Sequence, residues 1–121
     1  MTNSEVMTDP GDCLFCKIAA GEIPADIILS TDSVLAFRDI APTAPTHALV
    51  IPRKHYADAD QVAIHEPLLL AEMVRLAGQV AQLDGLVGYR LVSNKGAIAG
   101  QSVFHAHLHV LGGRVLHWPA G

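Results

Sequence analysis

The apolar positions of this chain repeat with two different periods, and each period predicts its own kind of element. Short segments with alternating or β-branched apolar side chains and turn residues at both ends are typical of strands. Five segments fit this description, namely residues 26–30, 33–38, 46–51, 89–94 and a histidine-containing segment that ends at Gly112-Gly113. Thr31-Asp32 separates the first two segments, so we predict a hairpin there and a mostly antiparallel sheet.

Two segments have helical spacing instead. Residues 66–83 carry apolar side chains three and four positions apart, with Pro67 in the first turn. A shorter amphipathic segment, residues 14–20, stops at Gly21, a residue that favours a helix C-terminus. We therefore predict an α+β fold in which an antiparallel sheet of about five strands carries one long and one short helix. The open edges and apolar face of such a small sheet favour a dimer.

Three histidines alternate with apolar residues in the last predicted strand: His105, His107 and His109. Alternate side chains of a strand share one face, so we expect the three imidazoles on one side and the apolar residues on the core side. A solvent-facing strand explains the pattern poorly, because neighbouring cationic imidazoles repel and gain nothing from packing. These imidazoles are the candidate chemical centre.

Composition narrows the classes of function. Half of the 121 residues are hydrophobic and 17% are charged, as in a single globular domain. The net charge of −4 gives no footprint for a nucleic-acid partner, although a small anionic ligand is compatible with it. We expect residues 1–11 to be a disordered tail and residues 12–121 to be one domain. Because neither a signal peptide nor an apolar run of transmembrane length is evident, we expect a cytoplasmic protein with no membrane partner.

The only two cysteines, Cys13 and Cys16, form a Cys-x-x-Cys pair. A structural disulfide is disfavoured in a reducing cytosol, which leaves half of a zinc site, a redox pair or two buried thiols. The redox alternative is the weakest of the three, because no predicted strand precedes Cys13. A zinc site needs two more ligands, and the seven histidines of the chain can supply them.

Three imidazoles on one face are compatible with a catalytic zinc site, with nucleophilic attack by one imidazole, or with a pH switch. The neighbouring sequence favours the nucleophile. Gly100, Gln101 and Ser102, together with the Asn94/Gly96 turn, combine small residues with neutral donors, which suits a phosphate. No acidic residue lies near the histidines in sequence to complete a hydrolytic zinc site or a serine triad. Ser102 is therefore expected to donate a hydrogen bond and not to attack.

The segment His105-Ala-His107-Leu-His109-Val-Leu resembles the histidine triad signature, in which histidines alternate with apolar residues. Other segments resemble the same family, so that the likeness extends from Asp12 to Gly121: residues 15–24, 36–40, 44–55 and 100–109. The ending Gly-Gly-Arg-Val-Leu-His-Trp-Pro is similar to that of the Hint branch, the histidine triad nucleotide-binding proteins. Ala120 stands where this branch usually has proline.

The resemblance implies a HIT-like homodimer that binds a purine nucleotide. It implies hydrolysis of AMP or GMP phosphoramidates, or of acyl and aminoacyl adenylates, through a nucleotidyl-histidine intermediate. His107 is the implied nucleophile, provided that a backbone carbonyl holds its Nδ1–H and leaves Nε2 as the lone pair. The implied catalytic residues are His107, His109, His47 and Ser102. The implied nucleotide-binding residues are Leu14, Phe15, Ile18, Ile23, Phe37, Asp39, Ile40, Asn94, Gly100, Gln101, Ser102, His107 and His109.

Some of these residues also have plainer explanations. Phe15 and Phe37, which the resemblance places against the base, also suit an ordinary core. Asp39, the implied acceptor from the ribose hydroxyls, could instead cap a turn. His47 is the least certain member, with an implied proton path through Ser102 to His107 or to the leaving amine.

Some members of the family also bind zinc, and the matching positions here are Cys13, Cys16, His55 and His105. Two cysteines and two histidines form a closed structural set, so this zinc would brace the site and take no part in the chemistry. Two alternatives to the enzyme stay open. One is a nucleotide-binding adaptor with vestigial hydrolysis, and the other is a zinc hydrolase that uses the three histidines.

Overall fold

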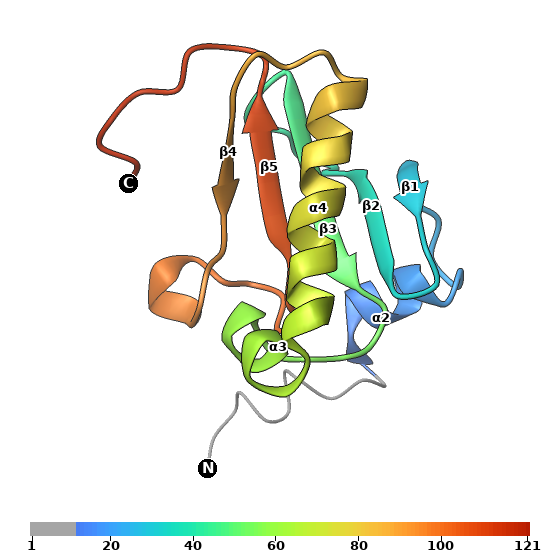
Figure 1. Ribbon diagram of the computed structural model, residues 1–121. Coiled ribbons are helices and arrows are strands. Elements are labelled where there is room, and N and C mark those ends of the chain that lie inside the picture. The colour runs from blue at the N-terminus through green and yellow to red at the C-terminus, as the bar shows by residue number, and fades with distance from the viewer. Residues whose placement is uncertain (1–11) are drawn as a thin grey trace.

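The computed structural model describes residues 12–121, which form a five-stranded antiparallel sheet with helices on both faces (Figure 1). The strand order is β1-β2-β3-β5-β4. The strands are β1 (Ile27–Ser30), β2 (Val34–Arg38), β3 (Thr46–Pro52), β4 (Tyr89–Val92) and β5 (Leu108–Gly112). The helices are α2 (Leu14–Ala19), α3 (Ala59–His65) and α4 (Pro67–Leu83), and a short 3₁₀ turn, η2, spans Ala97–Ala99. The predicted α+β fold is confirmed, whereas the predicted tail lies outside the described residues.

One face of the sheet packs against α4, the long helix that crosses the front of Figure 1. Its buried stripe has the predicted spacing of three and four residues, and its members are Leu69, Met73, Leu76, Ala77, Val80 and Ala81. The sheet meets this stripe with alternate residues of β2, β3 and β5, which are Val34, Ala36, Ala48, Val50, Leu108 and Val110. Burial of this apolar surface is the main force that holds the helix on the sheet.

The opposite face carries α2 and a second buried cluster. Phe15 of α2 packs there against Phe37 and Leu49, which alternate with the α4-facing residues of their strands. Leu49 pairs directly with His109 across β3 and β5, so this histidine lies on the α2 face. The sheet therefore separates a core beneath α4 from a face on which polar side chains collect.

The helix α3 is missing from the sequence prediction. Its signal is local: the carboxylate of Asp58 accepts from the backbone N–H of Gln61 at 3.0 Å and caps the first turn. Only Val62 of this helix is buried, so its apolar periodicity is too short to mark it. Within residues 12–121, no helix has the length and apolarity needed to cross a bilayer.

The histidine segment departs from the predicted strand, because β5 begins only at Leu108. His105 and His107 precede it in irregular extended chain. The pairing with the neighbouring strands stops first: the β3–β5 ladder stops at the Val50–Leu108 pair although β3 continues to Pro52, and the β4–β5 ladder stops at the Val92–His109 pair, where β4 ends. Without ladder partners, the chain before Leu108 is held by other contacts, and the Ala106 backbone N–H donates to the Tyr56 carbonyl at 2.7 Å.

Candidate active site

The three histidine rings lie on the α2 face of the sheet despite the short strand. The Phe15 ring contacts the rings of His105 and His107 edge-on, with centroids 6.0 and 5.1 Å apart. The rings of His107 and His109 follow, with centroids 5.0 Å apart. The predicted shared face is therefore present, but the neighbourhoods of the three rings are different.

His105 belongs to a cluster with Cys13, Cys16 and His55, whose ligand atoms all lie within 4.8 Å of one another. The Cys13 and Cys16 sulfurs lie 3.3 and 3.4 Å from Nδ1 of His105, and the Cys16 sulfur lies 3.2 Å from Nδ1 of His55. A tetrahedral zinc with its usual bond lengths places sulfur and nitrogen ligands about 3.5 Å apart. The donor set and the spacing therefore fit the zinc site implied by the sequence.

The contact made by Nε2 of His105 explains why Nδ1 is the nitrogen that faces the sulfurs. Nε2 lies 2.7 Å from the carbonyl of Pro52, and because a carbonyl only accepts, Nε2 carries the proton. Nδ1 is then an unprotonated ligand atom, an orientation typical of metal-binding histidines. The ring is fully buried, and burial lowers the pKa of His105 to about 4, so it stays neutral. Burial, with Cys13 next to it, raises the pKa of the Cys16 thiol to about 12.

His107 is held by the opposite nitrogen. Its Nδ1 lies 2.7 Å from the backbone carbonyl of His105, so Nδ1 donates and Nε2 keeps the lone pair. This is the arrangement required of the nucleophile predicted from the sequence. Burial lowers the pKa of His107, which keeps the lone pair available near neutral pH.

His109 contacts a fourth imidazole that comes from β3. Its Nδ1 lies 2.9 Å from Nε2 of His47. The Thr43 backbone N–H donates to Nδ1 of His47 at 3.0 Å, so that nitrogen is unprotonated and Nε2 carries the ring proton. His47 is buried, with 7% of its surface exposed.

The fold brings one carboxylate to these rings, which corrects the inference from sequence spacing that none is near. Oδ2 of Asp39 lies 3.3 Å from Nε2 of His47, while Oδ1 accepts from the Ala41 backbone N–H at 2.8 Å. Asp39, His47 and His109 thus come within metal-ligand distance of one another. They do not fit a metal site, because a metal on Nε2 would move the proton of His47 to Nδ1, against the Thr43 N–H.

The residues predicted to bind phosphate divide into two groups by whether their side chains are already hydrogen-bonded. Asn94 is half-buried and Ser102 is exposed, and within residues 12–121 neither side chain makes a hydrogen bond, so both can serve a ligand. Gln101 is buried, and its amide donates to the Ala57 and Val103 carbonyls while its oxygen accepts from the Gly96 N–H. This side chain braces the loop from inside. Gly100 has φ +98°, a conformation that favours glycine, and its surface is exposed.

No hydrogen bond within the described chain joins Ser102 to His47 or His107. The first link of the expected proton path through Ser102 is therefore not formed in this structure. His47 contacts His109 directly instead.

The apolar residues expected around a base differ in exposure. Phe15 and Phe37 are 5% and 4% exposed, so they offer little surface to a ligand, and Phe15 supports the rings of His105 and His107. Ile18 and Ile23 are half-buried, Leu14 is 44% exposed and Ile40 is fully exposed. These four side chains are the ones still accessible to a ligand.

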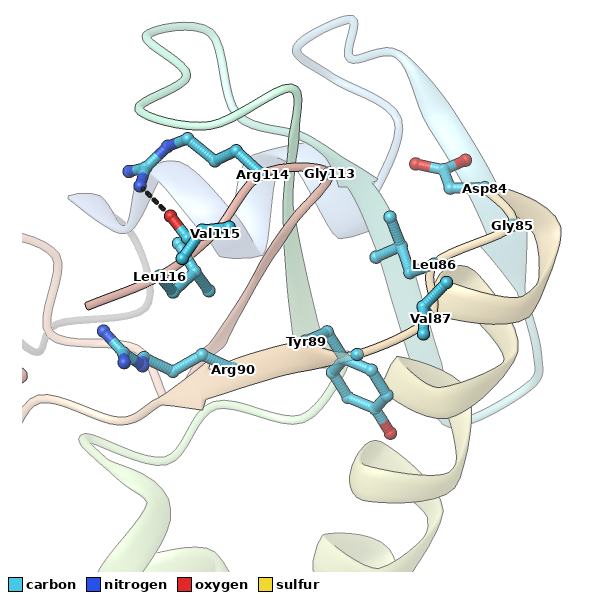
Figure 2. Close-up of a pocket in the computed structure, with 11 residues that line it drawn as sticks. Asp84, Gly85, Leu86, Val87, Tyr89, Arg90, Gly113, Arg114, Val115 and Leu116 are labelled. Carbon is cyan, nitrogen blue, oxygen red and sulfur yellow. Dashed lines mark hydrogen bonds between the residues drawn. The ribbon is translucent and has the colours of Figure 1, made fainter. Parts of the chain in front are cut away.

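A hollow of about 620 Å³ lies elsewhere, between the turn after α4, strand β4 and the C-terminal segment (Figure 2). Figure 2 shows Arg114, Val115 and Leu116 along one side and Tyr89 and Arg90 along another. None of the predicted site residues lines it. The histidine chemistry is therefore outside this hollow.

Sequence reasoning missed the groups that set the protonation of the site. They are the carbonyls of Pro52 and His105 and the N–H of Thr43. All three are main-chain groups, and because every residue type carries the carbonyl and every type except proline the N–H, no residue pattern marks them. Only the fold shows which of them meets an imidazole.

The chain is similar to known proteins over most of its length. The HIT domain family profile matches residues 20–116. An uncharacterized HIT-like protein of Synechococcus elongatus is 46% identical over 111 residues, which are 91% of this chain and 97% of the relative. A HIT family hydrolase from Legionella pneumophila is 52% identical with a TM-score of 0.87, and the match covers 91% of this chain and all of that one. A histidine triad nucleotide-binding protein from Candida albicans is 31% identical with a TM-score of 0.75, covering 91% and 85%.

These matches extend over nearly all of the described chain, and the matched region holds the sheet, α4 and all three histidines. The fold is that of HIT family hydrolases. The chain therefore belongs to the HIT domain family.

Proposed function

We propose that this protein hydrolyses purine nucleoside phosphoramidates, or the chemically related acyl and aminoacyl adenylates, as a member of the Hint branch. The observation that carries the proposal is the 2.7 Å contact between Nδ1 of His107 and the carbonyl of His105, which directs the Nε2 lone pair into the site. A neutral, buried imidazole with a fixed lone pair is a competent nucleophile at neutral pH. The names of relatives described as hydrolases and nucleotide-binding proteins support the same class.

The proposed reaction has two displacements at the α-phosphorus. Nε2 of His107 forms a bond to phosphorus, and the phosphorus–nitrogen bond to the amine breaks. The amine leaves with a proton, for which we assign the exposed hydroxyl of Ser102 as the last donor. Water then attacks the nucleotidyl-histidine, the phosphorus–Nε2 bond breaks, and the nucleoside monophosphate is released.

We assign the remaining site residues to binding. His109 and the uncommitted side chain of Asn94 would hold the phosphate oxygens. Asp39 would accept from the ribose hydroxyls, beside the exposed Ile40. In this role the turn bond from Ala41 to one carboxylate oxygen of Asp39 orients the carboxylate for the ribose.

We also propose a structural zinc on Cys13, Cys16, His55 and His105. Bound there, zinc would tie α2 to the segment before β5 and supply rigidity, with no part in the reaction. The benefit to the site is indirect: His105 provides the carbonyl that orients His107. Metal analysis of the purified protein should give one zinc per chain, and Cys16→Ser should lose it.

The homodimer is part of the same proposal. Strand β4 is at the edge of the sheet, so one row of its backbone groups has no strand partner within the described chain. Apolar side chains are exposed on and near this edge, including Val87 and Tyr89. A second copy pairing at β4 would cover them. Light scattering should give twice the 12.9 kDa mass of the chain.

The decisive experiment is intact-protein mass spectrometry after a rapid, acid-free quench with an adenosine phosphoramidate. Wild type should carry a nucleotidyl adduct, and His107→Ala should carry none while still binding AMP. Product without an adduct would call for burst kinetics to detect a short-lived intermediate. If neither adduct nor product forms and AMP still binds, the protein is a nucleotide-binding adaptor. A zinc hydrolase would instead lose its chemistry as soon as a chelator removes the metal.

A further inference from the structure

His47 and His109 form an imidazole pair in the site whose bond the proposed chemistry does not yet use. Their nitrogens approach to 2.9 Å, a hydrogen-bond distance at which one proton must lie between them. Two lone pairs, or two N–H groups, would repel at this separation. The question is which ring owns the proton.

The backbone of Thr43 answers it. Its N–H can only donate, and it lies 3.0 Å from Nδ1 of His47. A proton on that Nδ1 would face the N–H directly, so Nδ1 must be bare. His47 therefore carries its proton on Nε2 and donates it to Nδ1 of His109.

This assignment also determines the state of the other ring nitrogen of His109. With Nδ1 accepting, the remaining ring proton of His109 is on Nε2. Burial, with His107 and His47 next to it, lowers the pKa of His109 to about 4, so the ring holds only one proton. The facing groups are His107, His47 and Asp39, and only Asp39 opposes this shift.

The backbone of Thr43 is itself anchored by the segment after β5. The guanidinium of Arg114 donates to the Thr43 carbonyl at 3.1 Å. Gly113 has φ +91°, and a Cβ built there would lie 2.8 Å from Cβ of Pro45. The residues that follow β5 thus pack tightly on the loop that carries Thr43.

We infer that His47 is a positioning residue, and that the Thr43 N–H acts through it to hold the proton of His109 on Nε2. This assignment rests on the proposed function for its purpose, because an N–H on Nε2 is what a phosphate oxygen requires from His109. The two adjacent rings are then complementary: His107 presents a lone pair and His109 presents a proton. His47 acts on the reaction only through its hydrogen bond to His109.

Asp39 is the competing acceptor. Its Oδ2 lies 3.3 Å from the same Nε2 of His47, farther than the 2.9 Å to His109. If the Nε2–H of His47 pointed at Asp39 alone, no proton would lie in the 2.9 Å contact between His47 and His109. The closer contact therefore assigns the proton to His109, with Asp39 adding a weaker attraction.

The test is direct observation of the ring protons by long-range ¹H–¹⁵N correlation NMR on the full chain, without substrate. His109→Gln identifies the signals of His109. The wild-type spectrum should show His109 as a single Nε2–H tautomer. A wild-type Nδ1–H tautomer at His109 would overturn the assignment.

A matched pair of variants isolates the backbone N–H. Thr43→Pro removes it, and because residue 42 is also proline, the chain is already biased toward the extended conformation that a following proline needs. Thr43→Ala keeps the N–H and loses only the hydroxyl. We expect Thr43→Pro to show a mixture of His109 tautomers and Thr43→Ala to match wild type. An unchanged His109 in a folded Thr43→Pro protein would contradict the inference.

If Thr43→Pro does not fold, His47→Leu and His47→Gln decide the question by the same spectrum. Leucine breaks the chain of hydrogen bonds from the Thr43 N–H through residue 47 to His109, so His109 should show mixed tautomers. The glutamine amide can still accept from Thr43 and donate to His109. Identical His109 spectra in the two variants would reject this chain of hydrogen bonds. With an adenosine phosphoramidate, kcat/KM should fall about threefold to tenfold in His47→Leu and recover in part in His47→Gln. Because the NMR result needs no substrate, it stands even if the proposed substrate class is wrong.

Discussion

His105 of the cysteine–histidine cluster and His107, the proposed nucleophile, are separated by one residue in the chain, yet they use their imidazoles in opposite ways. In His105, Nε2 is tied to the Pro52 carbonyl and Nδ1 faces two sulfurs. In His107, Nδ1 is tied to the His105 carbonyl and Nε2 faces the site. Only Ala106 separates the two rings in sequence.

The difference shows that residue type does not assign a role within a run of histidines. Each imidazole has two nitrogens, and a carbonyl that accepts from one leaves a lone pair on the other. The Pro52 carbonyl leaves Nδ1 of His105 in the position of the proposed ligand atom, and the His105 carbonyl leaves Nε2 of His107 in that of the proposed nucleophile. The predictions below separate the two clusters, from the largest expected effect to the smallest.

Removal of the nucleophile should have the largest effect. His107→Ala should lower kcat for adenosine phosphoramidate about 10³-fold or more, because no other group attacks phosphorus. AMP affinity should change by less than about tenfold, since His109 and Asn94 remain. Steady-state kinetics and AMP titration measure both quantities. Retention of more than a tenth of the wild-type kcat would mean that the chemistry lies elsewhere.

Loss of a cluster ligand should act on stability first. Cys16→Ser should lower the free energy of unfolding by about 2–4 kcal/mol, because a buried cluster loses a partner and the metal it would bind. Urea denaturation with and without chelator measures this change. At temperatures where the variant stays folded, kcat should fall less than about tenfold. A loss of turnover as large as that of His107→Ala would favour a catalytic metal.

Acid should weaken the fold through His109. Its pKa is lowered to about 4 in the folded chain, chiefly by burial, against an ordinary value of 6.5. The unfolded chain binds the proton more readily between these values, so stability is full above about pH 6.5 and decreases as the pH falls towards 4. With allowance for partial exposure, we expect His109 to account for about 1–2 kcal/mol of this loss. The unfolding free energy of His109→Gln should depend less on pH in this window, and an equal slope would contradict the assignment.

The smallest effect should come from Phe15, whose ring contacts one histidine of each cluster. Phe15→Leu removes the ring that contacts His105 and His107 and should lower the free energy of unfolding by about 1–1.5 kcal/mol. Because neither backbone carbonyl is changed, kcat should change by less than about threefold. Phe37→Leu is the matched control, since the ring of Phe37 contacts Phe15 but, unlike that of Phe15, makes no ring contact with His105 or His107. A much larger loss of kcat in Phe15→Leu alone would show that this ring orients the nucleophile.

Much of the architecture could be predicted from local patterns. The stripe of α4 and the paired strands β1 and β2 follow periods of 3.6 and two that any reader of the chain can count. Helix α3 was not predicted because it buries a single residue, Val62, and one buried position cannot show a helical period. The predicted strand through His105 was wrong for a different reason: a strand extends only as far as its ladders with β3 and β4, and where those ladders stop is a property of the sheet.

The sequence by itself determined the inventory of the site: alternating histidines, two cysteines, a glycine-rich donor loop, and a likeness strong enough to indicate the family. Tertiary structure alone decided how those groups divide. It placed Asp39 from the end of β2 beside His47, and it buried Gln101 as a brace within its loop. It also set each ring proton through a main-chain carbonyl or N–H. The physical reason is that every residue except proline carries the same backbone groups, so which one meets an imidazole is decided only when the chain has folded.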